Sequence, residues 1–400
     1  MRSRIDLVDV PSTGVPDDSY HYNPPSQYNF VRALHDRLGG LEDVEKWRAP
    51  TIPSQFEIHL APTDKREACN YRCAVCAGQN TTLEVADWDE TMLGLLHNLQ
   101  GVVPYNIFGG NYTEPMLNER FADFLEITKM YGGHFGVHTN GSQIPLLAYR
   151  GDIDRVLSLS GVDAEDYISV SVYGGNRDSY AKFTGTHPDQ GYFEAMVEGI
   201  KILGERRKML DSKVSVRLSY LGSGVNLNED EVGYMVALAE KAEVDSMRVS
   251  IAFAPYGVDF NNLEAYSKWE DRAEARLLKW LPRYLSRGDQ KPNIFYRPVA
   301  FQKPHLFDPI EKCYYGYYQI TAGADGYWYR CSTVTTSEPH RLGPITDNVD
   351  DFMHVLELNQ DPDFRAKETC MDCNWRCNQM GIQINRYFNL DGNDPLIHFE

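Results

Sequence analysis

From residue 54 onward, short apolar runs alternate with longer stretches in which apolar residues recur every three or four positions. The short runs are typical of buried strands, and the longer stretches predict amphipathic helices. The predicted strands cover residues 56–60, 105–108, 134–138, 168–172, 214–220 and 247–253. The predicted helices include residues 117–131, 192–206, 229–242 and 271–284. Six strand–helix units in succession predict an α/β fold with a parallel sheet, either open or closed into a partial barrel.

Two parts of the chain depart from this pattern. Residues 1–50 are rich in Pro, Ser, Tyr and Asp, and we expect them to form an N-terminal extension. The α/β core is expected over residues 51–304. Beyond it the chain is rich in Tyr, Gly, Cys and Asp and holds only short predicted strands. We therefore expect a small α+β module over residues 305–388 and a tail over residues 389–400.

The composition indicates a folded, acidic protein. Hydrophobic residues make up 42% of the 400 residues and charged residues 24%, which favours a buried core over disorder. The formal net charge of −18 argues against general nucleic-acid binding, because domains that bind nucleic acids normally carry a basic surface. The sequence contains no run of about 18 apolar residues, so we expect no membrane partner.

The eight cysteines are better explained as metal ligands than as disulfides. The first residues lack the apolar core of a secretion signal, so we expect a cytoplasmic protein whose thiols stay reduced. The distribution of the cysteines supports this interpretation. Three of them lie within residues 69–76, and the other five lie beyond residue 312.

Cys69, Cys73 and Cys76 lie in one short loop that follows the first predicted strand. Their spacing suits three corners of a 4Fe–4S cubane and leaves the fourth iron without a protein ligand. Catalysis at a metal requires such an open coordination position. The alternatives are a zinc site or unrelated thiols. Zinc sites normally have four protein ligands, and the next cysteine is more than 200 residues away.

This Cys-x3-Cys-x2-Cys loop, placed after the first strand of a parallel α/β domain, resembles the signature of the radical S-adenosylmethionine (SAM) superfamily. The resemblance implies a partial (β/α)6 barrel in which the unique iron binds the amino and carboxylate groups of SAM. Cleavage of SAM would yield a 5′-deoxyadenosyl radical, which takes a hydrogen atom from the substrate. Val75 departs from the family pattern, in which an aromatic residue usually precedes the last cysteine.

The segment after the second predicted strand resembles the Gly-Gly-Glu-Pro turn of the same family. The resemblance implies that Gly109 and Gly110 let the backbone approach the methionyl group of SAM. It also implies an acceptor side chain for the ammonium group. By register this acceptor corresponds to Asn111, and by the Glu-Pro pair it corresponds to Glu114. The sequence leaves both alternatives open.

Three later strands carry further matches to the family's SAM-binding positions. Asn140 belongs to a Thr-Asn-Gly turn that ends the third predicted strand. Ser169 and Ser171 on the fourth strand match a ribose-binding position, and Arg217 on the fifth matches a carboxylate partner. The expected location of all these residues is the carboxyl end of the sheet, where ligands bind in such folds.

The C-terminal cysteines resemble the auxiliary-cluster modules of radical SAM enzymes, known in a full (SPASM) and a shortened (twitch) version. Five cysteines suffice for one fully ligated cubane, so the resemblance implies the shortened version and a second 4Fe–4S cluster. The implied ligands are Cys313, Cys331, Cys370 and Cys373. Cys377 is either an alternative ligand or free. A four-cysteine zinc ribbon is the alternative to this cluster.

Three reaction classes are compatible with the resemblance. The one we favour is oxidation of a small hydroxylated substrate, as in the sugar and aminocyclitol dehydrogenases of natural-product biosynthesis. The second is a redox-neutral epimerisation, dehydration or decarboxylation, in which Cys377 would be the catalytic hydrogen donor of an epimerase. The third is maturation of a ribosomal peptide. The electron donor would be flavodoxin or ferredoxin. Lys65, Arg66 and Arg72 beside the first cluster loop are either its docking patch or ordinary solvated surface charges.

Aromatic and imidazole side chains near the strand ends are candidates to line the active site. These candidates are His138, Tyr173, Tyr220 and Tyr256. Aromatic residues at such positions also occur often in the core, so the sequence alone does not separate the two roles.

Overall fold

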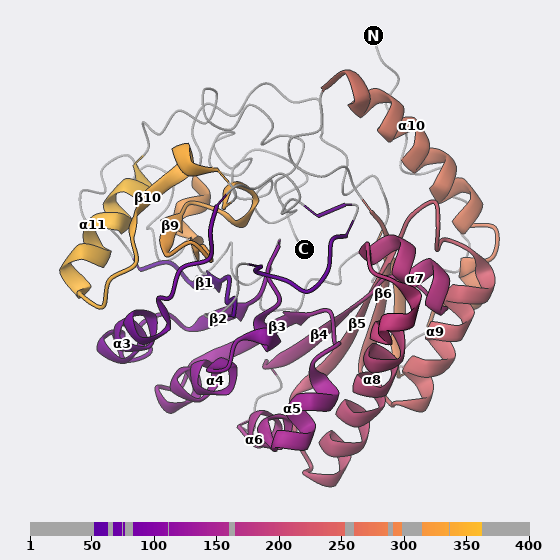
Figure 1. The fold of residues 1–400 in the computed structure, drawn as a ribbon, viewed down its shortest axis with the longest axis horizontal. Coiled ribbons are helices and arrows are strands. Elements are labelled where there is room, and N and C mark those ends of the chain that lie inside the picture. Colours follow the sequence, from indigo (N-terminus) through magenta and orange to yellow (C-terminus); the bar gives the residue numbers. More distant parts are fainter. Residues whose placement is uncertain are drawn as a thin grey trace, which may run out of the picture.

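A computed structural model places one mixed sheet at the centre of the protein, with helices along one of its faces (Figure 1). The structure describes residues 52–62, 67–73, 75–76, 83–110, 112–159, 165–252, 260–286, 291–297, 314–335 and 337–361. The sheet has ten strands in the order β10-β9-β8-β1-β2-β3-β4-β5-β6-β7. In chain order these are β1 (Gln55–Ile58), β2 (Tyr105–Phe108), β3 (His134–Thr139), β4 (Tyr167–Val172), β5 (Ser215–Gly222), β6 (Ser246–Ile251), β7 (Asn293–Arg297), β8 (Gln319–Ala322), β9 (Tyr327–Tyr329) and β10 (Arg341–Pro344).

Strands β1 to β7 are parallel and lie in chain order, and helices cross between consecutive strands. Figure 1 shows the strands bent into an arc with these helices on its outer side. The helices are α3 (Asp89–Leu99), α4 (Phe121–Met130), α5 (Ile144–Arg150), α6 (Asp152–Leu157), α7 (Arg177–Thr184), α8 (Tyr192–Met209), α9 (Glu229–Lys241) and α10 (Phe260–Leu277). The predicted α/β fold is confirmed, and the arc decides for a partial barrel over a flat open sheet.

All six predicted strands are present, and the sequence interpretation missed a seventh parallel strand, β7. Its segment holds only three consecutive apolar residues, Ile294 to Tyr296, between polar ones. A run this short is no clear strand signal on its own. Its pairing with β6 gives it a place in the sheet.

The two faces of the sheet differ in polarity, as β5 shows. Val216, Leu218 and Tyr220 point to the outer face and are buried, whereas Arg217 and Ser219 on the inner face are half-buried. Tyr220 therefore packs in the core, where its hydroxyl donates to the carbonyl of Asn226 at 2.5 Å. Of the two roles left open for Tyr220, the structure favours packing in the core, because the strand's alternation turns its side chain toward the helices.

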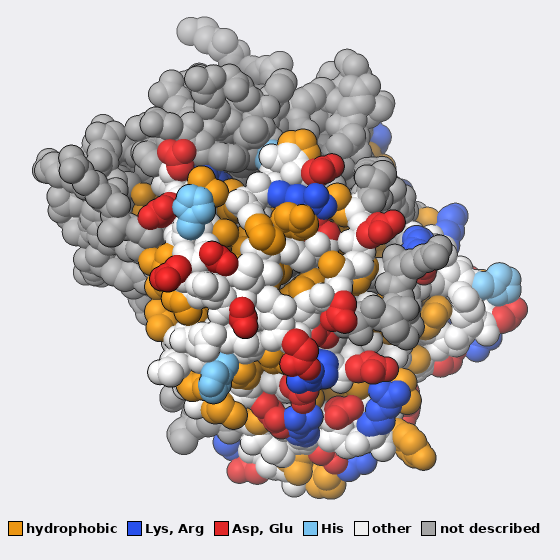
Figure 2. Space-filling view, turned by 60° about the vertical axis from the view of Figure 1, so that its left-hand side comes forward, with side chains coloured by type: hydrophobic (Ala, Val, Ile, Leu, Met, Phe, Trp, Pro, Cys, Tyr) orange, Lys and Arg blue, Asp and Glu red, His pale blue; other side chains and the backbone are white. Residues whose placement is uncertain are grey.

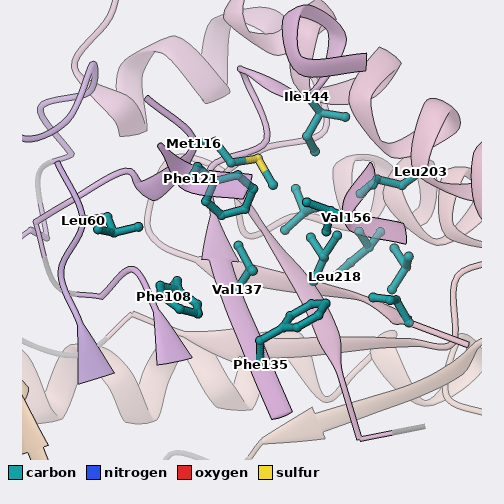
Figure 3. Packing of buried hydrophobic residues seen from close by; sticks show 14 of the residues in the cluster. Leu60, Phe108, Met116, Phe121, Phe135, Val137, Ile144, Val156, Leu203 and Leu218 are labelled. Carbon is teal, nitrogen blue, oxygen red and sulfur yellow. The ribbon is translucent and has the colours of Figure 1, made fainter. Parts of the chain in front are cut away.

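The hydrophobic core lies between the outer face of the sheet and the helices. Figure 3 shows Phe108, Val137 and Leu218 from the strands in one apolar cluster with Ile144 of α5 and Leu203 of α8. All five side chains are buried. Burial of apolar side chains of this size contributes about 1.5–3 kcal/mol each, so this layer holds the helices against the arc.

The C-terminal strands extend the sheet beyond β1. Strand β8 pairs with β1 in parallel, and β9 and β10 follow as antiparallel strands. Helix α11 (Val349–Gln360) covers them, as the gold elements of Figure 1 show. Phe56 of β1 packs against Trp328 and Phe352, with ring centroids 5.5 and 5.4 Å away. The described strands of the expected second module thus share a sheet and a core with residues 51–304, and the boundary near residue 304 stays a prediction.

The described surface mixes charges of both signs. Figure 2 shows Lys and Arg side chains beside Asp and Glu on one face of the molecule. Several of these charges form ion pairs, such as Arg155 with Glu126 and Asp123. Within the described residues, we find no helix with the length and apolar character needed to cross a membrane.

Candidate active site

The cysteine loop follows β1 at the carboxyl end of the sheet. Cys69, Cys73 and Cys76 are all half-buried. The amide of Cys76 donates to the carbonyl of Cys73 at 2.9 Å, which closes a turn between the second and third cysteines. All three predicted ligands of the first cluster therefore lie in one short, folded loop.

Tyr71 and Arg72 anchor this loop to helix α7. The Tyr71 side chain is buried, and its hydroxyl lies 3.0 Å from the hydroxyl of Tyr180. The amide of Arg72 donates to the carbonyl of Thr184 at 2.7 Å. Gly185 ends α7 with φ +66°, and a Cβ there would lie 2.5 Å from the Arg72 carbonyl oxygen. A glycine is therefore required both by the left-handed backbone and by the close approach of the loop.

Gly109 and Gly110 form the turn after β2 and lie against β1. Gly109 has φ +86°, and its amide donates to the Ile58 carbonyl at 2.9 Å. A Cβ on Gly110 would lie 2.2 Å from Glu57 Oε1 and 2.7 Å from His59 Nε2. These two side chains are buried and hydrogen-bonded to each other at 2.9 Å. The pair thus forms a wall behind the double-glycine turn.

Glu114 connects this turn to the end of β3. Its side chain is buried, and its two carboxylate oxygens accept hydrogen bonds from Thr139 Oγ1 at 2.6 Å and from the Asn140 amide at 2.6 Å. The Met116 amide donates to it as well, at 3.2 Å. Burial raises the pKa of Glu114 to about 7, although these donors oppose the shift. Both oxygens of Glu114 are thus engaged by this chain, and Asn111 lies outside the described residues.

Asn140 brings the Thr-Asn-Gly turn to the cysteine loop. Its side-chain amide donates to Asn70 Oδ1 at 2.9 Å and lies 3.9 Å from the sulfur of Cys69. Asn70 in turn donates to Ser142 Oγ at 3.0 Å. The amide of Glu114 donates to the carbonyl of Ala68 at 3.0 Å, one residue before Cys69. Three segments far apart in the sequence are therefore hydrogen-bonded into one site.

The predicted ribose and carboxylate partners lie on the inner face of the sheet. Ser169 of β4 pairs with Arg217 of β5, and Ser171 points the same way two residues further along. The guanidinium of Arg217 lies over the ring of Tyr167, 4.0 Å from its centroid. Tyr167 also shares a 2.9 Å hydrogen bond with His138. The structure places His138, Ser169 and Arg217 in adjacent positions of three neighbouring strands.

The donor set of the cysteine loop fits an iron–sulfur cluster. Burial raises the pKa of Cys69 to about 12, and the charges of Glu114 and Cys76 add to this shift. Burial also raises the pKa of Cys73 well above its ordinary value, and Cys69 and Cys76 add to that shift. Bound metal deprotonates thiol ligands, so iron binding would release these protons. Among the described residues no three His, Cys, Asp or Glu side chains converge on a single metal ion. The corners of a cubane lie farther apart than the ligands of one ion, so this finding is compatible with a cluster loop.

The predicted second cluster falls mostly outside the described residues. Cys313, Cys370, Cys373 and Cys377 lie there, as does Tyr256. Cys331 is described, half-buried, directly after β9. Tyr173, another candidate lining residue, is half-buried and stacks on Phe183 with ring centroids 5.0 Å apart.

The sequence interpretation missed the residues that support the site from behind. Asn70 and Tyr71 lie inside the cysteine motif but are not part of its spacing. Glu57 and His59 do follow a visible signal, because two ionisable residues alternate with apolar ones along β1. They could have been predicted from the sequence, because a strand with one polar face directly before a metal-binding loop indicates residues that support the site.

The fold defines the class of structure to which this protein is similar. It is a partial barrel of parallel strands, and the cysteine loop lies at their carboxyl ends. No protein-family model matches the sequence, and no curated protein matches it. Among solved structures, SuiB from Streptococcus suis bound to S-adenosylmethionine has a TM-score of 0.56 at 15% identity, covering 90% of this chain and 79% of SuiB. SuiB bound to its precursor peptide SuiA has a TM-score of 0.53 at 13% identity, covering 88% and 74%. At these identities the likeness shows a shared fold.

Proposed function

We propose that this protein is a radical SAM enzyme. Cys69, Cys73 and Cys76 would hold a 4Fe–4S cluster, and SAM would bind its open iron. The observation that supports this most is the hydrogen bonding of Asn140 to the cysteine loop, at Asn70 and beside Cys69. It joins the loop to the Thr-Asn-Gly turn at the carboxyl end of the sheet, which resembles a SAM-binding turn. The shared fold with SAM-bound SuiB supports the same assignment.

The residues around the loop would position SAM. Gly109 and Gly110 would let the backbone approach its methionyl group, and Asn111 or Glu114 would accept a hydrogen bond from its ammonium group. Because Glu114 already accepts three hydrogen bonds from the protein, its arrangement favours Asn111 as the direct acceptor. When bound, the cluster and SAM supply one-electron hydrogen abstraction from the substrate.

Asn140, Ser169, Ser171 and Arg217 would complete the SAM site. Asn140 is buried beside the loop, and the two serines lie along the inner face of β4. Arg217 is the positively charged residue of the adjoining strand β5, and it pairs with Ser169 in the sheet register. An arginine suits a carboxylate because its guanidinium can donate two parallel hydrogen bonds.

For the reaction, we favour oxidation of a small hydroxylated substrate, of the sugar or aminocyclitol type. A second 4Fe–4S cluster would be held by Cys313, Cys331, Cys370 and Cys373 and would accept electrons. In a redox-neutral epimerisation, Cys377 would instead return a hydrogen atom. Flavodoxin or ferredoxin would reduce the first cluster near Arg72, whose half-exposed guanidinium forms an ion pair with Glu67.

A ribosomal peptide is the second candidate substrate. The observation that favours it is the shared fold with SuiB in complex with its precursor peptide. Anaerobic reactions with a panel of sugars, aminocyclitols and peptides separate the candidates. The substrate is the compound that is itself modified while SAM is cleaved.

The central test concerns the three cysteines of the loop. The reconstituted protein should hold about eight irons in two cubanes and form 5′-deoxyadenosine from SAM under anaerobic reduction. The variant with Cys69, Cys73 and Cys76 all changed to Ala should hold about four irons and form none. Formation of 5′-deoxyadenosine by this variant would show that the assignment is wrong. Iron and sulfide analysis, with chromatography of the nucleoside, measures both results.

A further inference from the structure

The inner face of strands β3 to β7 carries positive charge in an acidic protein. The chain has 57 Asp and Glu residues against 39 Lys and Arg. Strand alternation and register nevertheless place three arginines on this inner face, Arg217 of β5, Arg248 of β6 and Arg297 of β7. At the inward positions of these five described strands there is no Asp or Glu. A concentration of one charge against the overall balance is typical of a binding surface.

Arg248 has a fixed orientation on this face. It stands beside Ser219 of β5 in the sheet register, and its Nη2 donates to Ser219 Oγ at 2.7 Å. On its other side in the register lies Phe295 of β7, which is buried. The hydrogen bond to Ser219 and the neighbouring apolar ring limit the positions open to the guanidinium. An arginine held in this way loses less entropy when it binds an anion.

His138 of β3 lies in the same region. Its pKa is lowered below the ordinary value, first because protein surrounds the ring and then because Arg248 and Arg217 are near, while Glu57 opposes the shift. The His138 side chain is nevertheless exposed on the inner face of the sheet, and the direction of the shift leaves its ring neutral at pH 7. The positive charge here therefore belongs to the arginines.

Arg217 and Arg248 would bind different anionic groups. Arg217 leans over Tyr167, and its position matches the carboxylate partner of SAM. Arg248 lies one strand further along, with its side chain two positions closer to the strand ends than that of Arg217. The two arginines therefore occupy different places on the inner face of the sheet.

We propose that Arg248, oriented by Ser219, binds a carboxylate or phosphate group of the substrate on the inner face of the barrel. This inference rests on the proposed function and narrows its substrate to an anionic compound. Carboxylates and phosphates both present oxygen pairs that match the two terminal nitrogens of a guanidinium. The anionic group would fix one end of the substrate and leave the rest of it free to extend toward the cysteine loop.

The test measures binding of inorganic phosphate and of succinate to the full-length reconstituted protein by calorimetry, with and without saturating SAM. Wild-type protein should bind at least one of them. Arg248→Gln should weaken that binding about tenfold or more, as expected for the loss of hydrogen bonds to a charged group. Arg248→Lys should have an intermediate effect, since it keeps the charge and loses the paired geometry. Arg155→Gln, the same change at a surface arginine of α6, should have no effect.

Ser219→Ala gives a second measurement that removes only the group orienting Arg248. It should weaken binding of the same probe severalfold without altering the fold seen by circular dichroism. Binding of phosphate alone would indicate a phosphorylated substrate, and binding of succinate alone a carboxylate. Absence of binding to wild type, or equal binding by wild type and Arg248→Gln, would overturn the proposal.

The outcomes separate this inference from the proposed function. Protein that forms 5′-deoxyadenosine but binds neither probe at Arg248 would remain a SAM enzyme without the anionic subsite. Protein that binds a probe through Arg248 but never cleaves SAM would keep the subsite and lose the proposed function.

Discussion

At the scale of single residues, the turn after β2 depends on the missing side chain of Gly110. The Glu57–His59 pair fills the space where a Cβ would lie, and both side chains are buried. Glu57 is further held by Gln319, whose Nε2 donates to Glu57 Oε2 at 2.7 Å. The pair therefore has little freedom to withdraw, and any larger residue at position 110 has to displace the turn itself.

We expect Gly110→Ala to destabilise the protein by about 1–3 kcal/mol, the usual cost of forcing extra atoms into a packed site. SAM affinity should fall with it, because the displaced turn is the one proposed to hold the methionyl group. Gly224→Ala is the matched control, since a Cβ there meets only Trp269 Nε1 at 3.9 Å. Urea unfolding and SAM titration measure both variants. Equal stability of the two would contradict the close contact.

Glu114 should make stability depend on pH. Its pKa in the folded protein is about 7, against an ordinary value of 4.5. Between these values the unfolded chain is ionised while the folded chain keeps the proton, so stability falls as pH rises from about 4.5 to about 7. Compared with Glu114→Gln, wild type should lose roughly 3 kcal/mol across this window. Urea unfolding of both proteins at several pH values measures the difference, and a constant difference would refute the raised pKa.

At the scale of elements, the seam between β1 and β8 is polar and buried. Gln319, the first residue of β8, lies at the centre of its side-chain hydrogen-bond network. Its Nε2 donates to Glu57, and its Oε1 accepts from Gln55 Nε2 at 2.8 Å and from Tyr315 OH at 2.9 Å. Buried polar groups are costly when unpaired, so this network favours one register of β8 against β1. Because β9 pairs with β8 and Cys331 follows β9, the register of β8 against β1 also fixes the position of Cys331 relative to the cysteine loop.

Gln319→Ala should cost about 1–3 kcal/mol, because it leaves the buried Glu57 oxygen and the Tyr315 hydroxyl without this partner. Backbone amides of β8 should exchange hydrogen faster, while those of β5 keep their protection. Glu240→Ala, at an exposed position of α9, should change stability by less than about 0.5 kcal/mol. Unchanged exchange in β8 would mean that the network does not hold the seam.

At the scale of the whole molecule, the core and the C-terminal strands depend on each other. Phe56 of β1 is fully buried, and Trp328 and Phe352 supply part of its surroundings. Without β8, the edge of β1 would offer unpaired backbone groups to other chains. The cysteine loop follows β1 and Cys331 follows β9, and both strands belong to the same continuous sheet. The two described places proposed to hold clusters are therefore connected through this sheet.

A chain ending at residue 304 should therefore aggregate or form a loosely packed state. It lacks the partners of β1 and exposes Phe56. Binding of a hydrophobic dye and loss of the near-ultraviolet circular dichroism signal would report this state. A soluble, cooperatively unfolding product would instead show that residues 305–388 form a separate domain, as the sequence boundary suggests.

The sequence by itself determined the local features of this protein. Strand and helix periods, the order of six strand–helix units and the spacing of Cys69, Cys73 and Cys76 are all properties of neighbouring residues. Local alternation was enough to predict the fold class, because a strand's two faces differ in polarity wherever one of them is buried. It failed for β7, whose apolar run is too short.

Only the tertiary structure decided which distant segments meet. Asn140 reaches Cys69 across 71 positions of sequence, and Gln55 reaches Gln319 across 264. Nothing local marks Asn70 or Gln319 as a partner, because each is an ordinary polar residue until the order of the strands brings its neighbour to it. Strand order depends on the packing of the whole sheet, so the site's supports, the partial barrel and the place of β8 follow from the folded chain alone.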